Sequence, residues 1–170
     1  GFNDTRGSEF NIANVVNIKT FLKNCSGIRI LYLLEFSALT TDRLNSVTKI
    51  VAQLKGLFPD CIDEVAACTM VGFTKVPKEK SQDTINYWCQ QFVDSATAAG
   101  FSILRSNVLV IDPLEIRPQC SRQDLMNAIS SLHLVEKPHE KYNPSLTDRD
   151  QIALQQMLSQ IEHHVRNYVA

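Results

Sequence analysis

The chain has 170 residues, of which 21% are charged and 44% are apolar, and its formal net charge at pH 7 is −1. This is enough chain for one domain with a sizeable core, and the composition is that of an ordinary globular protein. The nearly neutral charge argues against nucleic acid as a partner. No apolar run reaches the roughly 20 residues that a membrane crossing needs, so no transmembrane segment is expected.

The cysteines indicate the compartment. They are odd in number, widely spaced and form no CxxC pair: Cys25, Cys61, Cys68, Cys89 and Cys120. This spacing argues against a zinc site, and we expect no bound metal from these residues. Reduced thiols are typical of an intracellular protein, most simply a cytoplasmic one.

The N-terminal part predicts a loop, a helix and a strand. Residues 1–9 are small, polar and interrupted by glycine, which is typical of a loop. Residues 11–24 place apolar side chains on one helical face. Residues 28–36, with the sequence IRILYLLEF, form an apolar run that predicts a strand buried on both faces.

The strongest helical pattern follows, and after it comes the run on which the rest of the prediction depends. Thr40-Thr41-Asp42 offers N-cap oxygens, and Pro59-Asp60 ends the helix. The apolar positions between them match the i, i+3, i+4, i+7 spacing: Val47, Ile50, Val51, Leu54, Leu57 and Phe58. Residues 66–73 then predict a second strand buried on both faces, which ends abruptly at Thr74-Lys75.

A helix and a third strand come next. Ser81 and Asp83 can cap a helix whose end is marked by Gly100, a favourable residue just past a helix C-terminus. Residues 107–111 predict the third strand, which Asp112-Pro113 ends.

Two more helices are predicted towards the C-terminus. Ser121 and Asp124 resemble a capping box for residues 124–132. A stripe of apolar residues indicates the last helix: Leu154, Leu158, Ile161, Val165 and Tyr168. We therefore divide the chain into a body (1–135), a linker with two prolines (136–146) and a C-terminal helix (147–170).

Alternating helices and strands predict the fold class. Strands joined through helices in one sheet form right-handed parallel crossovers. We expect an α/β fold with three α-β-α layers and a mainly parallel sheet, of which this chain supplies three strands.

Thr74 and Lys75 are the first candidate site residues. Ligands of open α/β sheets bind just past the carboxyl ends of the strands. The aliphatic stem of a lysine there can cover a planar ring while its charge reaches the edge of the ligand. The alternative is a lysine that leaves a strand for solvent, which on spacing alone is the more common case.

The opening loop is the second candidate. Gly1 permits close approach of the backbone to a ligand, and Asp4 and Arg6 are charged groups ahead of a helix. The alternative is an ordinary loop, in which residues 7–10, Gly-Ser-Glu-Phe, are either native or a remnant of cloning.

Together these two segments resemble motifs of the P-loop GTPase superfamily, in its septin-like and AIG1-like branch. Gly1-Phe2-Asn3-Asp4-Thr5 is similar to the continuation of the third motif, and a second alignment places that motif on residues 4–7. Thr74-Lys75-Val76-Pro77 is similar to the first half of the fourth motif, Asn/Thr-Lys-x-Asp. The resemblance covers residues 1–132 and implies the latter half of a G domain, a partial P-loop NTPase fold.

The resemblance implies roles for these residues. Lys75 would pack on the guanine base of GTP, and Thr74 would support that loop. Gly1 would offer its N–H to the γ-phosphate, and Asp4 and Arg6 would belong to switch II. GTP and Mg²⁺ would be held only together with a phosphate loop, because this sequence contains no Gly-x-x-x-x-Gly-Lys-Ser/Thr motif.

The chain also departs from the pattern. Pro77 stands where an aspartate would read guanine, so the motif leaves guanine selectivity open. Asp112-Pro113 does not match the fifth motif, Ser-Ala-Lys. We therefore expect no GTP hydrolysis by these 170 residues alone.

A second class of function stays open, a nucleotide-free scaffold or protein-interaction module within a larger assembly. Residues 143–170 would then form a partner-binding or oligomerising helix. In either case the apolar run 28–36 calls for a neighbouring strand, from an upstream half of the same protein or from a partner chain, with self-association as one form of the latter.

Overall fold

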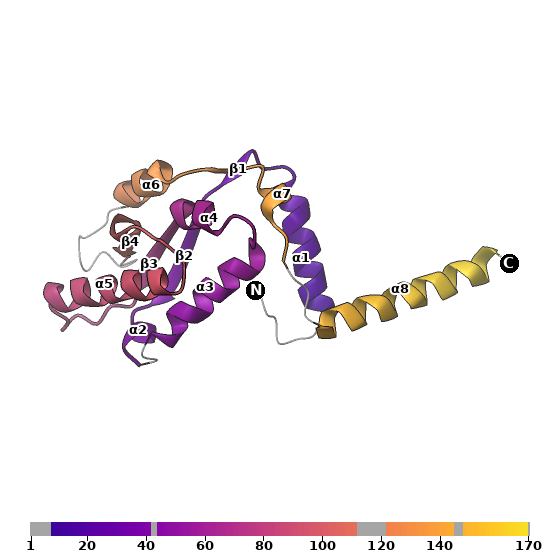
Figure 1. The fold of residues 1–170 in the computed structure, drawn as a ribbon, viewed down its shortest axis with the longest axis horizontal. Coiled ribbons are helices and arrows are strands. Elements are labelled where there is room, and N and C mark those ends of the chain that lie inside the picture. Colours follow the sequence, from indigo (N-terminus) through magenta and orange to yellow (C-terminus); the bar gives the residue numbers. More distant parts are fainter. Residues whose placement is uncertain (1–7, 42–43, 112–121, 145–147, 170) are drawn as a thin grey trace.

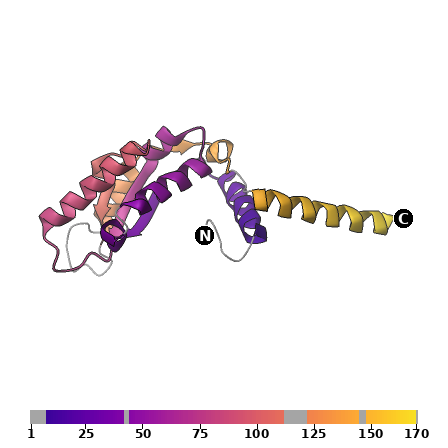
Figure 2. The same ribbon diagram turned by 60° about the horizontal axis from the view of Figure 1, so that its bottom comes forward.

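The structure is a computed structural model that describes residues 8–41, 44–111, 122–144 and 148–169. A mixed α/β body carries a long C-terminal helix, α8 (Asp148–Val169), which extends away from it in both ribbon views (Figures 1 and 2). The first turns of α8 lie beside the N-terminal helix α1 (Ser8–Leu22). The rest of α8 therefore stands apart from the described body.

Three parallel strands form the sheet at the centre of the body. They are β2 (Ile30–Glu35), β3 (Thr69–Thr74) and β4 (Val108–Val110), in the spatial order β2-β3-β4. A separate two-stranded antiparallel ladder joins β1 (Gly27–Ile28) to β5 (Val135–Glu136). The parallel sheet with helical crossovers confirms the expected α/β class.

Two helices cover one face of the sheet. These are α3 (Asn45–Leu57) and α5 (Gln82–Ala98). The Tyr32 hydroxyl donates to Oε1 of Gln53 on α3 at 3.2 Å, and the Phe73 ring meets the Phe92 ring of α5 edge-on at 5.4 Å between centroids. Tyr32 pairs with Val71 in the ladder, and side chains alternate along a strand, so Tyr32 and Phe73 point to the same face. The main core lies between this face and the two helices.

The predicted helix ends of α5 are confirmed. The Ser81 side chain accepts a hydrogen bond from the Thr84 amide at 3.2 Å, as an N-cap does. Gly100 follows the helix with a φ of +76°, the left-handed conformation that glycine adopts without strain. The helices predicted elsewhere are present too, as α1, α3, α6 (Arg122–Ser131) and α8. The N-cap expected for α3 is wrong, because Thr40 and Thr41 belong to a separate short helix and their hydroxyls donate to the Ser37 carbonyl. The N-cap residue of α3 is Leu44, which has no side-chain acceptor. The expected capping residue Ser121 and the segment 112–120 lie outside the described residues.

The strand predicted over residues 66–73 begins later than expected. Residues 66–68 belong to a short helix, α4 (Ile62–Cys68), and β3 starts at Thr69. Asp63 and Glu64 favour the start of this helix, where its dipole is positive. The alanines that follow are strong helix formers, whereas apolar character alone does not distinguish a buried helix from a buried strand. From Thr69 to Phe73 the strand is buried on both faces, as predicted.

For the strand predicted over residues 28–36, the expected burial on both faces is wrong. Arg29 separates β1 from β2, and the side chains of β2 alternate between half-buried and exposed. Leu31 is 38% exposed and Leu33 is 56% exposed. These side chains are exposed because β2 is an edge strand, whose only neighbour among the described residues is β3.

The described part of the segment predicted as a linker is packed against the body. It contains a short helix, α7 (Pro138–Lys141), followed by Tyr142, which is 1% exposed and meets Phe58 edge-on at 5.6 Å. The Asn143 amide donates to the Leu57 carbonyl at 3.0 Å, and Lys141 forms an ion pair with Glu64. Two further short elements are α2 (Ser37–Thr41) and a 3₁₀ turn, η1 (Arg105–Asn107).

Candidate functional site

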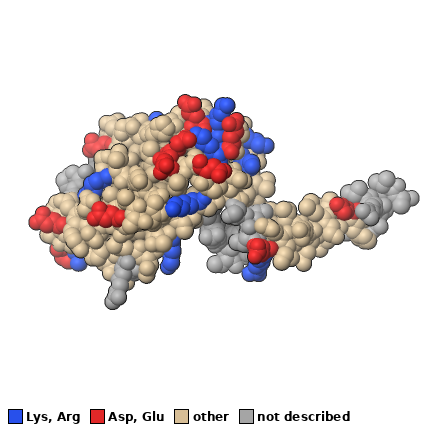
Figure 3. Space-filling model, in the orientation of Figure 1, with Lys and Arg blue, Asp and Glu red and all other residues tan. Residues whose placement is uncertain are grey.

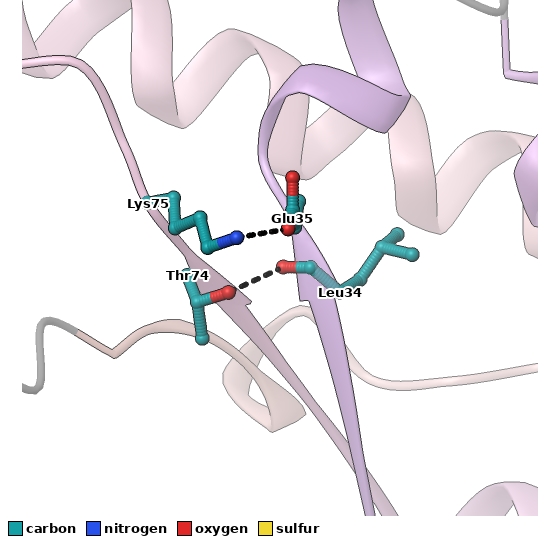
Figure 4. A network of polar contacts seen from close by, with 4 residues as sticks. All are labelled: Leu34, Glu35, Thr74 and Lys75. Atoms are coloured by element: carbon teal, nitrogen blue, oxygen red, sulfur yellow. Dashed lines mark hydrogen bonds and ion pairs between the residues drawn. The ribbon is translucent and has the colours of Figure 1, made fainter.

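The candidate site is the edge of the sheet where the three parallel strands end. Glu35 at the end of β2 is in register with Thr74 at the end of β3, and β4 ends beside them at Val110. Parallel strands bring their carboxyl ends to one edge, where ligands of α/β sheets bind. Thr74 and Lys75 therefore stand at the end of the central strand, as the sequence predicted (Figure 4).

Thr74 joins the two strands at this edge. Its hydroxyl donates to the Leu34 carbonyl at 3.3 Å, and its own carbonyl accepts from the Phe36 amide at 2.9 Å. The side chain is half-buried. Thr74 thus stabilises the geometry of the loop that follows it, and its hydroxyl is engaged within the protein.

Lys75 adopts an uncommon backbone conformation. Its φ is +54°, in the left-handed region that residues with a Cβ seldom occupy. Its side chain is 72% exposed and forms an ion pair with Glu35, whose side chain is 52% exposed (Figure 4). Strained residues of this kind cluster at ligand sites, and the conformation directs Lys75 back over the end of β2.

The residues after Lys75 form a turn that leads into α5. Pro77 is half-buried, and its carbonyl accepts from the Lys80 amide at 3.1 Å. Proline has no side-chain donor or acceptor, so this position has no group that reads a base edge. Ser81 then caps α5.

Three of the predicted site residues cannot be placed relative to this edge. Gly1, Asp4 and Arg6 lie outside the described residues, as do Asp112 and Pro113. The expected juxtaposition of the opening loop with Lys75 therefore stays a prediction.

Sequence reasoning missed Glu35 as a member of the site. The signal was present, because Glu35 is a charged residue that ends a predicted parallel strand, just as Lys75 follows one. Its carboxylate is the group that Lys75 contacts. Any ligand that uses the Lys75 ammonium must therefore displace or share this contact.

A shallow groove of about 270 Å³ lies elsewhere, between α5 and the outer edge of β4. Its lining includes Cys89, Arg105 and Val108. Nη1 of Arg105 donates to the Val108 carbonyl at 2.8 Å and so covers part of that edge. Burial raises the pKa of the Cys89 thiol, and the positive charge of Arg105 opposes this rise. The thiol is therefore an inert core group rather than a nucleophile.

Across the described ranges there is no group of three or more His, Cys, Asp or Glu side chains placed to hold a metal ion. None of the helices described combines the length and the hydropathy that a membrane crossing requires.

Comparisons with family models, with curated proteins and with solved structures found no match to this chain. The assignment of function therefore depends on the residues and their geometry.

Proposed function

We propose that this chain is the base-binding part of a nucleotide-binding module, with GTP as the nucleotide, in a larger GTPase-like protein of partial P-loop NTPase architecture. The observation that carries the proposal is Lys75, strained into the left-handed region at the carboxyl end of the central parallel strand. The three-layer arrangement and the likeness to a G domain are part of this proposal.

Each residue of the site has a defined role in this proposal. The aliphatic stem of Lys75 packs on the purine ring, and Thr74 holds the loop through its bonds to β2. Gly1 offers its N–H to the γ-phosphate, and Asp4 and Arg6 belong to a switch segment. Mg²⁺ and the phosphates are held by a phosphate loop that these 170 residues do not contain, so the chain alone does not hydrolyse GTP.

A binding titration with matched lysine variants tests the proposal. We expect the chain to bind GTP weakly, and Lys75→Ala to lower the affinity by about tenfold or more, because it removes both the stem and the charge. Lys78→Ala removes an exposed lysine three positions further on and serves as the control. Since Pro77 replaces the base-reading carboxylate, ATP should bind nearly as well as GTP. Equal affinities for the Lys75 and Lys78 variants, or no binding at all, would refute the proposal.

One observation favours a second function, a nucleotide-free protein-interaction module. The helix α8 projects from the body (Figure 1). It exposes Leu158 at 51% and Ile161 at 57%, and the two residues are one turn apart. In Figure 3 the coloured part of α8, which excludes its grey C-terminal end, carries few charges on the visible face. Such a stripe is typical of a helix that packs on a partner.

The two functions are separated by melting temperature and by variants of α8. A nucleotide module is stabilised by GTP, whereas a nucleotide-free module shows no shift. If α8 binds a partner, Leu158→Asp with Ile161→Asp abolishes the association, and Gln160→Asp, a polar position on the same helix, leaves it intact. A GTP-dependent rise in melting temperature together with no effect of the α8 variants would exclude the second function.

A further inference from the structure

β2 has an open edge formed by its odd-numbered residues. The Phe36 amide donates to the Thr74 carbonyl of β3, so the backbone of even-numbered residues points towards β3. Backbone groups alternate in direction along a strand, so those of Leu31, Leu33 and Glu35 point away from β3. Among the described residues no strand pairs with this edge.

The burial of β2 indicates that its missing neighbour lies beside the strand. Ile30, Tyr32 and Leu34 point to the helix-covered face and are still only half-buried, while Leu31 and Leu33 on the other face are exposed. β3, with a strand on each side, is buried from Thr69 to Phe73. A lateral neighbour would cover side chains on both faces of β2 at once.

β2 also lacks the features that prevent an edge strand from pairing with another chain. It contains no proline and no bulge, and its only charged residue, Glu35, is at its end. Arg29 immediately precedes the strand at the other end. An edge of this kind accepts another extended backbone.

We propose that the partner of this edge is β2 of a second copy of the chain, paired antiparallel about a two-fold axis at Tyr32. In this register Arg29 lies opposite Glu35 of the second copy at both ends, and Leu31 lies opposite the second copy's Leu33. The interface is self-complementary, as a two-fold interface must be. The two sheets join into one of six strands with the order β4-β3-β2-β2-β3-β4. This dimer is a form of the chain without an upstream half, because in the larger protein of the proposed function the strand that leads into the phosphate loop would occupy the same edge of β2.

Parity and charge together select this register. Pairing requires residues whose backbone faces outward on both copies, so only registers that place odd residues opposite odd residues are allowed. Shifting the two-fold axis by one residue places Leu31 opposite Glu35 or Leu33 opposite Arg29, and both cross-strand charge pairs are lost. The register centred on Tyr32 satisfies the charges and pairs leucine with leucine.

The side chains at the ends are placed to make these pairs. Nε of Arg29 donates to the Leu132 carbonyl at 3.0 Å, which anchors the guanidinium and leaves its Nη groups to reach a carboxylate. Glu35 bonds Lys75 on its own chain and has acceptor capacity for a second cation. At each end of the interface, the carboxylate of Glu35 thus lies between two cations, Lys75 of its own chain and Arg29 of the other copy.

A charge exchange measured by sedimentation velocity tests the proposal on the full 170-residue chain. Arg29→Glu alone places two carboxylates together at each end, and Glu35→Arg alone places two guanidinium groups together. Each single variant should weaken dimerisation by about tenfold or more, because like charges then face each other. An equimolar mixture of the two variants restores opposite charges at both ends, so it should form heterodimers with nearly the wild-type affinity.

Circular dichroism and thermal melts of each variant establish that the monomer remains folded. If a single variant unfolds, the double variant Arg29→Glu with Glu35→Arg within one chain recreates both pairs and should dimerise. A wild-type chain that stays monomeric up to about 1 mM would overturn the proposal. So would a dimer whose affinity is the same in the wild type, the single variants and the mixture, since its interface would then lie elsewhere.

Discussion

The ammonium group of Lys75 pairs with the carboxylate of Glu35, although the two residues are 40 positions apart in the chain. The contact joins the ends of two adjacent parallel strands, and Lys75, whose backbone is left-handed, reaches back over the end of β2 (Figure 4). Both side chains are largely exposed, so solvent screens the pair and its contribution to stability is small. The ion pair matters because it lies where the proposed ligand binds.

The strain at Lys75 predicts that glycine stabilises this position while removing its function. A residue with a Cβ costs about 1 kcal/mol in the left-handed region, and glycine does not. We expect Lys75→Gly to be more stable than Lys75→Ala by about 1 kcal/mol in urea denaturation, because both variants lose the same ion pair. Both should also lose nucleotide affinity. Equal stabilities would show that the backbone at this position is unstrained.

We predict that position 72 accepts only glycine, because the side chain of Ile111 fills the space that a Cβ would occupy. A Cβ on Gly72 would lie 2.2 Å from Cδ1 of Ile111 and 3.1 Å from Cδ2 of Leu33. We expect Gly72→Ala to destabilise the chain by about 1–3 kcal/mol, as overpacking does. Ile111→Val removes Cδ1, so the double variant should recover most of the loss.

Gly56 provides the control for this cycle. It lies in α3, and an added Cβ there meets nothing within 4 Å. Gly56 is the penultimate residue of the helix, so Gly56→Ala should raise the free energy of unfolding by less than the roughly 1 kcal/mol that the same change gives in a helix interior. Additive effects of the Gly72 and Ile111 substitutions, without coupling, would show that the two side chains do not compete for space.

Tyr142 is predicted to contribute through its ring and not through its hydroxyl. The residue is 1% exposed, and within the described part of the protein its buried hydroxyl has no hydrogen-bond partner. Tyr142→Phe should leave the free energy of unfolding unchanged or raise it by about 1 kcal/mol, since an unsatisfied polar group is removed. Tyr142→Ala should lower it by about 3–5 kcal/mol. A clear loss of stability in the phenylalanine variant would reveal a partner for the hydroxyl.

Because the thiol of Cys68 is buried, we predict that the chain loses stability at alkaline pH. Burial raises the pKa of its thiol from 9.0 to about 11. The folded state therefore retains a proton that the unfolded state loses, and this contribution is complete below pH 9 and disappears as the pH rises from 9 to 11. The difference in pKa corresponds to about 3 kcal/mol.

Urea denaturation across this pH range measures the effect. Cys68→Ala should be less stable at neutral pH because of the cavity, but its stability should fall less between pH 9 and 11. Burial also raises the pKa of Tyr32 and Tyr142, so a smaller slope should remain. Cys25→Ala, at a half-buried position beyond α1, is the control. The same slope in the Cys68 variant as in the wild type would contradict the prediction.

The sequence predicted those elements that are determined by residues close together in the chain. The periodic spacing of α3 and the Ser81 cap of α5 each act within a few residues, and both are observed. α4 was missed because residues 66–68 are apolar and lie next to a true strand, so composition alone could not separate the two. The burial of β2 depends on what lies beside it in space, which no local pattern contains.

The candidate site was predictable only in part for the same reason. Thr74 and Lys75 follow a buried strand, so their place at the edge of the sheet could be predicted from spacing. The ion pair with Glu35 arises from the register of β2 against β3, and the left-handed conformation of Lys75 arises from the turn that it begins. Neither is visible before the strands are paired.

The most direct test of the nucleotide-binding proposal is an amide chemical-shift titration of the 170-residue chain with GTP. The proposal predicts the largest shifts at Thr74, Lys75 and Val76, with smaller ones at Glu35 and Phe36, and their loss in Lys75→Ala but not in Lys78→Ala. Shifts confined to α8 or to the groove beside Arg105, or no shifts at millimolar GTP, would contradict it.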